Sequence, residues 1–261
     1  MKKLMAALLA ALALFSVAFA AEPVDLTTYT DAELIALIEQ AGAELRARNT
    51  PAAPADPLAD LRYASTGKEV RINAYVGATG DVYIPDEIDG VLVTTIYDGM
   101  CKSNRDVRSL RLPKGLVNIG SDAFYRTSAL EQLLIMPKTL KKIGSSAFGF
   151  SNVTGLVLQS DCLLDKQAFS FSDNLKFCYI REGCSVRLEW RVFQGSSIET
   201  IIIPADVKKI DATAFMSCNY VTVYCPAGSY AEQYCKENFI VCDTANYETM
   251  VAYYEALYPA E

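Results

Sequence analysis

An imperfect repeat of 21 to 24 residues constrains this sequence more than any other feature. A pair such as Ala-Phe, or a close substitute, recurs through the middle of the chain, with its second member at Cys101, Phe124, Phe148, Phe169, Phe193 and Phe215. Five or six residues after each pair comes an apolar triplet. The triplets are Val107-Leu110-Leu112, Leu130-Leu133-Ile135, Val153-Leu156-Leu158, Leu175-Cys178-Ile180, Ile198-Ile201-Ile203 and Tyr220-Val223-Cys225. A unit this short cannot bury its own apolar side chains, but stacked units can, so the repeat predicts a solenoid.

The spacing inside each unit predicts short parallel strands joined by tight turns. The last two members of a triplet lie two residues apart, which places their side chains on one face of a strand. Gly120 and Gly144 follow isoleucines and are predicted to let the chain turn sharply. Proline cannot donate to a strand ladder. It follows the third member of a triplet directly at Pro113, Pro204 and Pro226, and one place later at Pro137.

The stretch from Ser109 to Phe124 resembles the BspA-type leucine-rich repeat of secreted and surface bacterial proteins. The resemblance is carried by Ser109-Leu110-Arg111-Leu112-Pro113 and by Asn118-Ile119-Gly120-Ser121-Asp122-Ala123-Phe124. Residues 75–96 look like the family's first coil, and residues 223–232 look like its last coil and capping helix. The resemblance covers residues 63–243 and implies binding and adhesion to proteins or cell surfaces, with no shared catalytic residues. The chain departs from the pattern at Cys101 and around Cys162 and Cys184.

Residues 1–20 have the pattern of a secretory signal peptide. Lys2 and Lys3 precede an apolar run from Leu4 to Phe15, and small residues surround a cleavage point after Ala20. The alternative is a membrane anchor, but the run is shorter than the roughly 20 residues that span a bilayer. The mature chain is therefore predicted to be extracellular, either free or associated with the cell surface, and without a transmembrane span.

Residues 21–48 are predicted to hold a helix that begins near Asp31, because Thr30 and Glu33 fit a capping box. Apolar residues recur at helical spacing at Leu34, Ile38, Ala41 and Leu45. This stripe would pack against the main domain of a monomer or, alternatively, against a second copy in a coiled-coil dimer. Three prolines in residues 49–62 predict a semi-rigid linker.

Residues 244–261 predict another helix. Aromatic and apolar residues recur at helical spacing at Tyr247, Met250, Val251, Tyr254, Leu257 and Tyr258. The terminal coils of a solenoid need capping, so this helix is predicted to cover the last coil. The alternatives are that it rests on the exposed sheet face or binds a partner.

The chain contains no histidine, which excludes Ser-His-Asp and Cys-His nucleophiles and zinc sites with imidazole ligands. The formal net charge of -7 gives no basic surface for nucleic acid. Glycine-rich phosphate loops and acidic calcium loops are also missing from the sequence. We therefore expect no enzyme activity, no cofactor and no metal, although composition alone leaves open a pair of carboxylates flanking a cleft.

Eight cysteines permit disulfides outside the cell. The candidate pairs are Cys162 with Cys184 and Cys225 with Cys242, because each pair falls in neighbouring coils. Cys178 and Cys225 also occupy inward triplet positions, where a free cysteine acts as a small hydrophobe.

The side chains between the second and third triplet members are predicted to point away from the core. These residues, which we call the strand row, are Arg111, Leu134, Val157, Tyr179, Ile202 and Tyr224, with Phe177 two residues before Tyr179. Stacked coils would place them about 4.8 Å apart, and an apolar stripe of this kind often marks an interaction site. The alternatives are that such residues merely suit a strand surface, or that a terminal helix covers them.

Taken together, these patterns predict a secreted or surface-associated, non-catalytic binding protein that recognises a protein or cell-surface ligand in an adhesion-like role. One alternative is a carbohydrate-binding module in which Phe177, Tyr179 and Tyr224 stack on sugars. Another is a structural surface or matrix component that assembles through the N-terminal helix.

Overall fold

The computed structural model describes residues 30–48 and 51–259. Residues 30–48 and 248–259 belong to one compact unit, and residues 51–247 belong to a second. The signal segment predicted for residues 1–20 lies outside the described residues. No helix within the described ranges is long and apolar enough to cross a membrane.

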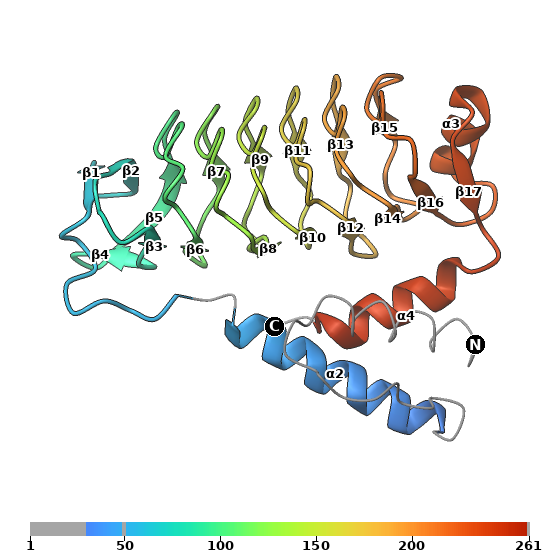
Figure 1. Ribbon diagram of the computed structural model, residues 1–261, viewed down its shortest axis with the longest axis horizontal. Helices are drawn as coiled ribbons and strands as arrows, with labels where there is room; N and C mark the ends of the chain where they lie inside the picture. Colours follow the sequence, from blue (N-terminus) through green and yellow to red (C-terminus); the bar gives the residue numbers. More distant parts are fainter. Residues whose placement is uncertain (1–29, 49–50, 260–261) are drawn as a thin grey trace. The chain divides into compact units, whose positions relative to one another are not determined.

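Residues 61–243 form a solenoid of about eight coils, whose short strands stack into two ladders (Figure 1). The first ladder runs in order through β1 (Leu61–Ser65), β2 (Val70–Tyr75), β5 (Val91–Ile96), β7 (Asn118–Ile119), β9 (Lys142–Ile143), β11 (Leu163–Leu164), β13 (Arg187–Leu188) and β15 (Lys209–Ile210). The second runs through β8 (Leu133–Ile135), β10 (Gly155–Leu158), β12 (Phe177–Ile180), β14 (Thr200–Ile202), β16 (Thr222–Tyr224) and β17 (Val241–Asp243).

The strands of successive coils pair in parallel, and antiparallel pairs occur only near the start of the described solenoid. There β1 pairs with β2, and β4 (Glu87–Ile88) pairs with β5. β3 (Asp81–Tyr83) and β6 (Ser109–Arg111) form a separate parallel pair. The predicted fold of short parallel strands joined by tight turns is confirmed.

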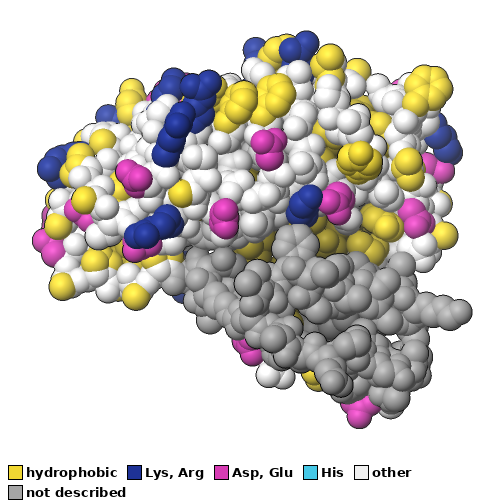
Figure 2. Space-filling model, in the orientation of Figure 1, with side chains coloured by type: hydrophobic (Ala, Val, Ile, Leu, Met, Phe, Trp, Pro, Cys, Tyr) yellow, Lys and Arg dark blue, Asp and Glu magenta, His cyan; other side chains and the backbone are white. Residues whose placement is uncertain are grey.

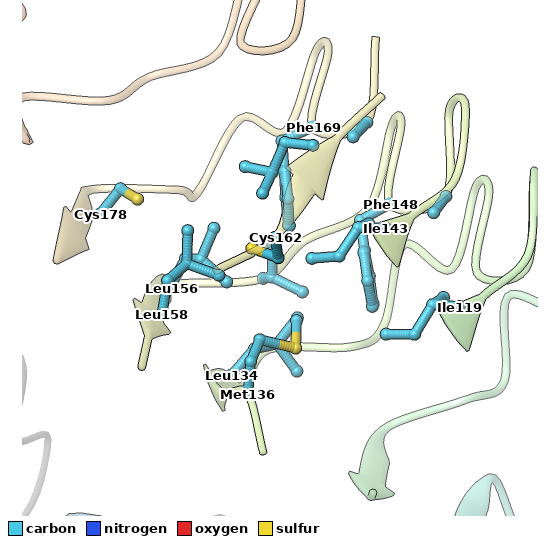
Figure 3. Packing of buried hydrophobic residues seen from close by; sticks show 14 of the residues in the cluster. Ile119, Leu134, Met136, Ile143, Phe148, Leu156, Leu158, Cys162, Phe169 and Cys178 are labelled. Atoms are coloured by element: carbon cyan, nitrogen blue, oxygen red, sulfur yellow. The ribbon is translucent and has the colours of Figure 1, made fainter. Parts of the chain in front are cut away.

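A ladder of phenylalanine rings fills the interior of the solenoid. Phe124, Phe148, Phe169, Phe193 and Phe215 are buried, with successive ring centroids 5.0, 5.2, 5.9 and 5.5 Å apart. Figure 3 shows Phe148 and Phe169 among the aliphatic side chains that the two strand ladders contribute to the core. Each ring packs on the rings of the adjacent coils, so the recurring aromatic couples neighbours that could not be stable alone.

The turn that carries each Ala-Phe pair holds residues in the left-handed conformation. Asp122 and Arg126, with φ of 56° and 59°, are the two such residues of one turn. The second of these positions recurs, always with positive φ, at Ser103, Arg126, Phe150, Phe171, Gly195 and Ser217. The coil geometry therefore imposes this conformation whichever side chain is present.

The two glycines predicted to allow a sharp turn have a different role. Neither Gly120 nor Gly144 has a positive φ. A Cβ atom on Gly120 would lie 2.5 Å from the backbone nitrogen of Asp98, and one on Gly144 would lie 2.6 Å from that of Ser121. Glycine is needed at both positions because the backbones of successive coils approach closely there, and the prediction of a glycine turn is wrong.

The coil at residues 130–137 departs by one residue from the predicted register. In the pairing of β8 with β10, Leu134 faces Leu156 and Ile135 faces Val157. Leu134 and Met136 therefore lie in the core (Figure 3), and the prediction that Leu134 points outward is wrong. A one-residue slip exchanges the two faces of a strand, so Leu133 and Ile135 take the outward positions.

One extra residue in this coil causes the slip. Leu130 precedes the inward Leu134 by four residues, whereas Val153 precedes Leu156 by three. In the observed register Pro137 directly follows the last inward residue, as proline does in the coils that end at Pro113, Pro204 and Pro226.

The side chain of Gln132 fills the gap that the extra residue leaves between coils. Its Nε2 donates to the carbonyl of Leu110 at 2.8 Å, and its Oε1 accepts from the Leu110 N–H at 2.7 Å. The amide group thus makes the two hydrogen bonds that a neighbouring strand would make. It links β6 to the β8 coil, although these two strands belong to different sheets.

The C-terminal end of the solenoid is closed by β17 and by α3 (Tyr230–Asn238), a cap that the family resemblance implied. Ser229 caps α3 by accepting a hydrogen bond from the Glu232 N–H at 3.2 Å. Tyr234 and Cys235 on α3 join the core, and the Tyr234 ring ends the phenylalanine ladder with its centroid 6.3 Å from that of Phe215. This helix therefore covers apolar surface that the last coil would otherwise expose.

The other unit pairs α2 (Asp31–Arg48) with α4 (Tyr247–Leu257), whose residues from 248 onward belong to it. Thr30 and Glu33 form the expected capping box, in which the Thr30 N–H donates to Glu33 Oε2 at 2.7 Å. Gly42 on α2 lies directly against the backbone of Leu257 on α4. The partner of α2 in this unit is thus the C-terminal helix, and the capping role predicted for residues 244–261 stays a prediction.

Candidate functional site

The strand row is not an open surface in this structure. The side chains of Val157, Tyr179 and Ile202 are 0% exposed, although none belongs to the core cluster of the solenoid. Leu134 lies on the opposite face of its strand, and Ile135 takes its place in the row. Large apolar side chains are costly to expose, at about 25 cal/mol per Å² of apolar surface, which favours burial of such a row. The binding role assigned to these residues stays a prediction.

Arg111, at the start of the strand row, is engaged in structural contacts. Its Nη2 lies 2.7 Å from Asp86 Oδ2, and its guanidinium lies 5.0 Å from the centroid of the Tyr83 ring. Burial alone would raise the pKa of Asp86, but hydrogen bonds from Arg111 and from the Lys114 N–H hold this pKa below its ordinary value. The arginine therefore ties β6 to the preceding coil.

The remaining two members of the strand row, Phe177 and Tyr224, are half-buried. Phe177 packs over Gly155 of the neighbouring coil, where a Cβ atom would overlap its ring. Burial, and then the charge of Asp243, raise the pKa of the Tyr224 hydroxyl. Both side chains are thus partly used in contacts between coils.

A different group of side chains gathers on the turns of three successive coils. It consists of Tyr125, Arg126, Phe150 and Phe171, and we call it the turn ladder. The rings of Phe150 and Phe171 stack with centroids 4.8 Å apart, and Tyr125 meets Phe150 edge-on at 5.6 Å. Phe150 is 40% exposed. Figure 2 shows hydrophobic and basic side chains adjoining along the solenoid edge where Figure 1 places the turns.

The backbone conformation at Phe150 and Phe171 is unfavourable for a bulky side chain. Their φ angles are 55° and 54°, and such positions in non-glycine residues cost on the order of 1–3 kcal/mol. The equivalent position holds Gly195 in the next coil, which makes room for the Phe171 ring: a Cβ atom there would lie 2.7 Å from it. The coil requires the conformation but not the aromatic ring, so these rings are candidates for a role other than folding.

Cations accompany the rings of the turn ladder. The guanidinium of Arg126 lies 5.2 Å from the Tyr125 centroid and 5.5 Å from the Phe150 centroid. Lys102 Nζ lies 5.7 Å from the Tyr125 centroid and is neutralised by Asp122 at 2.8 Å. Arg126 pairs with no carboxylate of the described residues. The turn ladder therefore combines exposed aromatic surface with an uncompensated positive charge.

Sequence reasoning missed the turn ladder because, in these turns, it considered only the phenylalanine of each Ala-Phe pair. The signal was nevertheless visible, since Phe148-Gly149-Phe150 and Phe169-Ser170-Phe171 each contain a second phenylalanine two residues after the buried one. Only the structure shows that these second rings stack on one another outside the core.

A shallow groove of about 410 Å³ lies on the N-terminal coils and contains the carboxylates of Glu69 and Asp98. Glu69 accepts a hydrogen bond from the Thr94 hydroxyl at 3.3 Å, and Asp98 accepts one from the Ser121 N–H at 2.8 Å. Both carboxylates thus connect successive coils. Within the described ranges, no cluster of three or more acidic or cysteine side chains is placed to hold a metal ion.

Comparison with protein families gives a match over residues 94–222, where six copies of the BspA type leucine rich repeat region are found. The chain carries a BspA-type leucine-rich repeat region. The recognition made from the repeat motif is confirmed. A comparison with curated proteins finds no match.

Solved structures similar to this chain include a leucine rich cell surface protein from Faecalibacterium prausnitzii, with 21% identity and a TM-score of 0.46. The match covers 68% of this chain and 55% of that one. A leucine rich repeat protein from T. pallidum has 21% identity and a TM-score of 0.45, with 65% and 70% covered. The pneumococcal vaccine antigen PcpA has 18% identity and a TM-score of 0.41, with 69% and 47% covered. The chain therefore spans about half the length of the first and third of these proteins.

The turn ladder lies inside the BspA-type region. The turn ladder is an exposed feature of this region that the coil geometry does not itself require.

Proposed function

We propose that this protein is an exported, non-catalytic binding protein that recognises a protein ligand through the turn ladder. One observation carries the proposal: phenylalanine, exposed at Phe150, occupies left-handed turn positions where serine and glycine serve the same fold. Strain of this kind persists where the surrounding structure sustains it, and it often accompanies function. Residues 1–20, with their signal pattern, support export.

The arrangement of the rings favours a protein ligand over a sugar. A sugar ring stacks on an aromatic face, but the Phe150 ring is already in contact with three neighbouring groups. Phe171 is stacked against it with 22° between the ring planes, while Tyr125 and the Arg126 guanidinium also contact it. The ring edges and the Arg126 guanidinium remain available to a ligand. The ring edges suit apolar side chains, and the guanidinium suits a carboxylate.

The proposed ligand is therefore a protein segment in which aliphatic or aromatic residues stand beside Asp or Glu. Arg126 would pair with the carboxylate, and a guanidinium already oriented on aromatic rings loses little conformational entropy on binding. The ligand residues beside the carboxylate would cover Phe150, the exposed member of the turn ladder.

A random-peptide phage library selected on the full chain tests the proposal. We expect enrichment of peptides that combine acidic and large apolar residues. Phe150→Ser should weaken binding of these peptides at least about tenfold, which is typical of a central aromatic contact. Arg126→Gln should weaken binding and reduce its sensitivity to salt.

Phe239→Ser is the matched control, because Phe239 is 96% exposed and also left-handed, with φ of 57°, but belongs to no aromatic ladder. It should bind the selected peptides as the unchanged chain does. Peptide binding that survives Phe150→Ser would contradict the assignment to the turn ladder. Glycan-array binding that is lost in Phe150→Ser would instead make the turn ladder a sugar-binding surface, which contradicts a protein ligand.

A further inference from the structure

Three cysteines from three different elements meet where the solenoid ends. Cys225 directly follows β16, Cys242 lies in β17, and Cys235 lies on the buried face of α3. The Sγ atoms of Cys225 and Cys242 are 3.3 Å apart. Burial, and then the neighbouring Cys242 and Cys225 thiols, raise the pKa of Cys235, so its thiol lies close to both. All three are free thiols in this structure. This cluster is independent of the turn ladder and of the function proposed for it.

The fold directs the Cys225 and Cys242 thiols toward each other. β16 and β17 pair in parallel with Val223 opposite Cys242, and the chain turns away from the ladder after Cys225 at Pro226. A disulfide requires an S–S distance of about 2.05 Å, so the two sulfurs need to approach by about 1.3 Å more, which small side-chain rotations supply. The two cysteines lie 17 positions apart in sequence, with all of α3 between them.

Access distinguishes this pair from the other candidate pair. Cys242 is the partly exposed member of its pair, whereas Cys225 is buried. Cys162 and Cys184 are both buried, at 5% and 7% exposure. The structure therefore favours Cys225 with Cys242 over Cys162 with Cys184.

We propose that Cys225 and Cys242 form a disulfide that fastens the C-terminal cap to the last coil, with Cys235 able to exchange with either. A low-molecular-weight disulfide is the oxidant. The Cys242 thiolate attacks it, forms a mixed disulfide and releases one thiol. The Cys225 thiolate then attacks the protein sulfur of the mixed disulfide and releases the second thiol. The two cysteines together lose two protons and two electrons, and the oxidant is reduced to two thiols.

The surroundings of the cluster set the pH dependence of the second step. Burial, together with a hydrogen bond to Cys242, raises the pKa of the Cys225 thiol to about 12. The carboxylate of Glu232 and the thiols of Cys235 and Cys242 lie near this group, whereas Lys236 is paired with Glu232 at 2.6 Å. Because only the thiolate attacks, closure of the disulfide should accelerate as pH rises.

The test is oxidation of the full chain with oxidised glutathione, followed by alkylation under denaturing conditions and peptide mapping. We expect a crosslinked pair of peptides containing Cys225 and Cys242, with a mass lower by two hydrogens, and faster formation at pH 9 than at pH 7. Amide exchange in β17 should slow about tenfold or more on oxidation, since the crosslink restrains the cap.

Cys225→Ala should abolish both the crosslink to Cys242 and the slowing of exchange in β17. Cys178→Ala is the control, because Cys178 is fully buried in the core away from the cap, and it should leave both unchanged. Alkylation of all eight cysteines after oxidation, or a crosslink that maps to Cys162 and Cys184, would overturn the proposal. If Cys225→Ala fails to fold, the peptide map of the unchanged chain still decides between these outcomes.

Discussion

Replacing Gln132 by leucine removes the side chain that bridges two coils across the extra residue. Leucine has a similar size but leaves the N–H and the carbonyl of Leu110 without the partners that now lie 2.7 and 2.8 Å away. A buried backbone group left unpaired costs about 1–3 kcal/mol. With two such groups, partly offset by the burial of an apolar side chain, the free energy of unfolding should fall by about 2–4 kcal/mol.

Equilibrium urea denaturation followed by circular dichroism measures this change, and hydrogen exchange at the Leu110 amide localises it. Each coil of a solenoid interacts only with its neighbours. If the contact between β6 and the β8 coil is weakened, the N-terminal coils should unfold first, and the urea unfolding transition should become broader. Gln194→Leu is the matched control, because Gln194 Oε1 is buried but accepts no hydrogen bond, and its loss should cost less than about 1 kcal/mol. Unfolding of Gln132→Leu like that of the unchanged chain, with the Leu110 amide still protected, would show that the Gln132 side chain does not bridge the two coils.

Two further predictions concern the core and the acid limit of stability. Phe169→Ala should lower the free energy of unfolding by about 3–5 kcal/mol in thermal or urea melts, because this fully buried ring stacks between Phe148 and Phe193. A loss below 1 kcal/mol, or a loss no greater than that of Phe150→Ala on the surface, would contradict the role given to the internal ladder. The pKa of Asp86 is lowered in the folded state, so its contribution to stability is present above the unfolded pKa of about 3.9 and is lost as pH falls through the folded pKa. Asp86→Asn should therefore flatten the loss of stability below about pH 4 in acid titrations, and an unchanged profile would argue against the Arg111 ion pair.

The repeat period was sufficient to predict most of the fold. Small residue, aromatic residue and apolar triplet recur because every coil must fill the same interior, so the pattern predicted a solenoid and parallel strands without any knowledge of contacts. Around Leu134 the same reasoning failed. It took the residue three positions after Leu130 as the inward one, whereas the inward residue is Leu134. The position of Pro137 already indicated this, because it follows the third member of the predicted triplet by two residues instead of one. Strand faces alternate with every residue, so one uncounted insertion reversed the assignment of a whole coil.

The candidate site was less accessible to sequence reasoning than the fold. Val157, Tyr179 and Ile202 were correctly separated from the solenoid core, but their burial depends on what surrounds the sheet, which no local pattern encodes. Phe150 and Phe171 repeat visibly in the sequence. Whether their rings stack in the core or on the surface depends on left-handed turns, which no sequence pattern here predicts.

The sequence by itself determined that this chain stacks coils of about 23 residues, that histidine chemistry is absent, and that residues 1–20 have a signal pattern. Those conclusions depend on period and composition, which are properties of one unit or of the whole chain. Tertiary structure alone decided that Gln132 bridges two coils, that the turn ladder stacks on the surface, and that Cys225 meets Cys242. Each of these is a contact between side chains from different coils or elements, and its geometry exists only once the backbone has closed around the core.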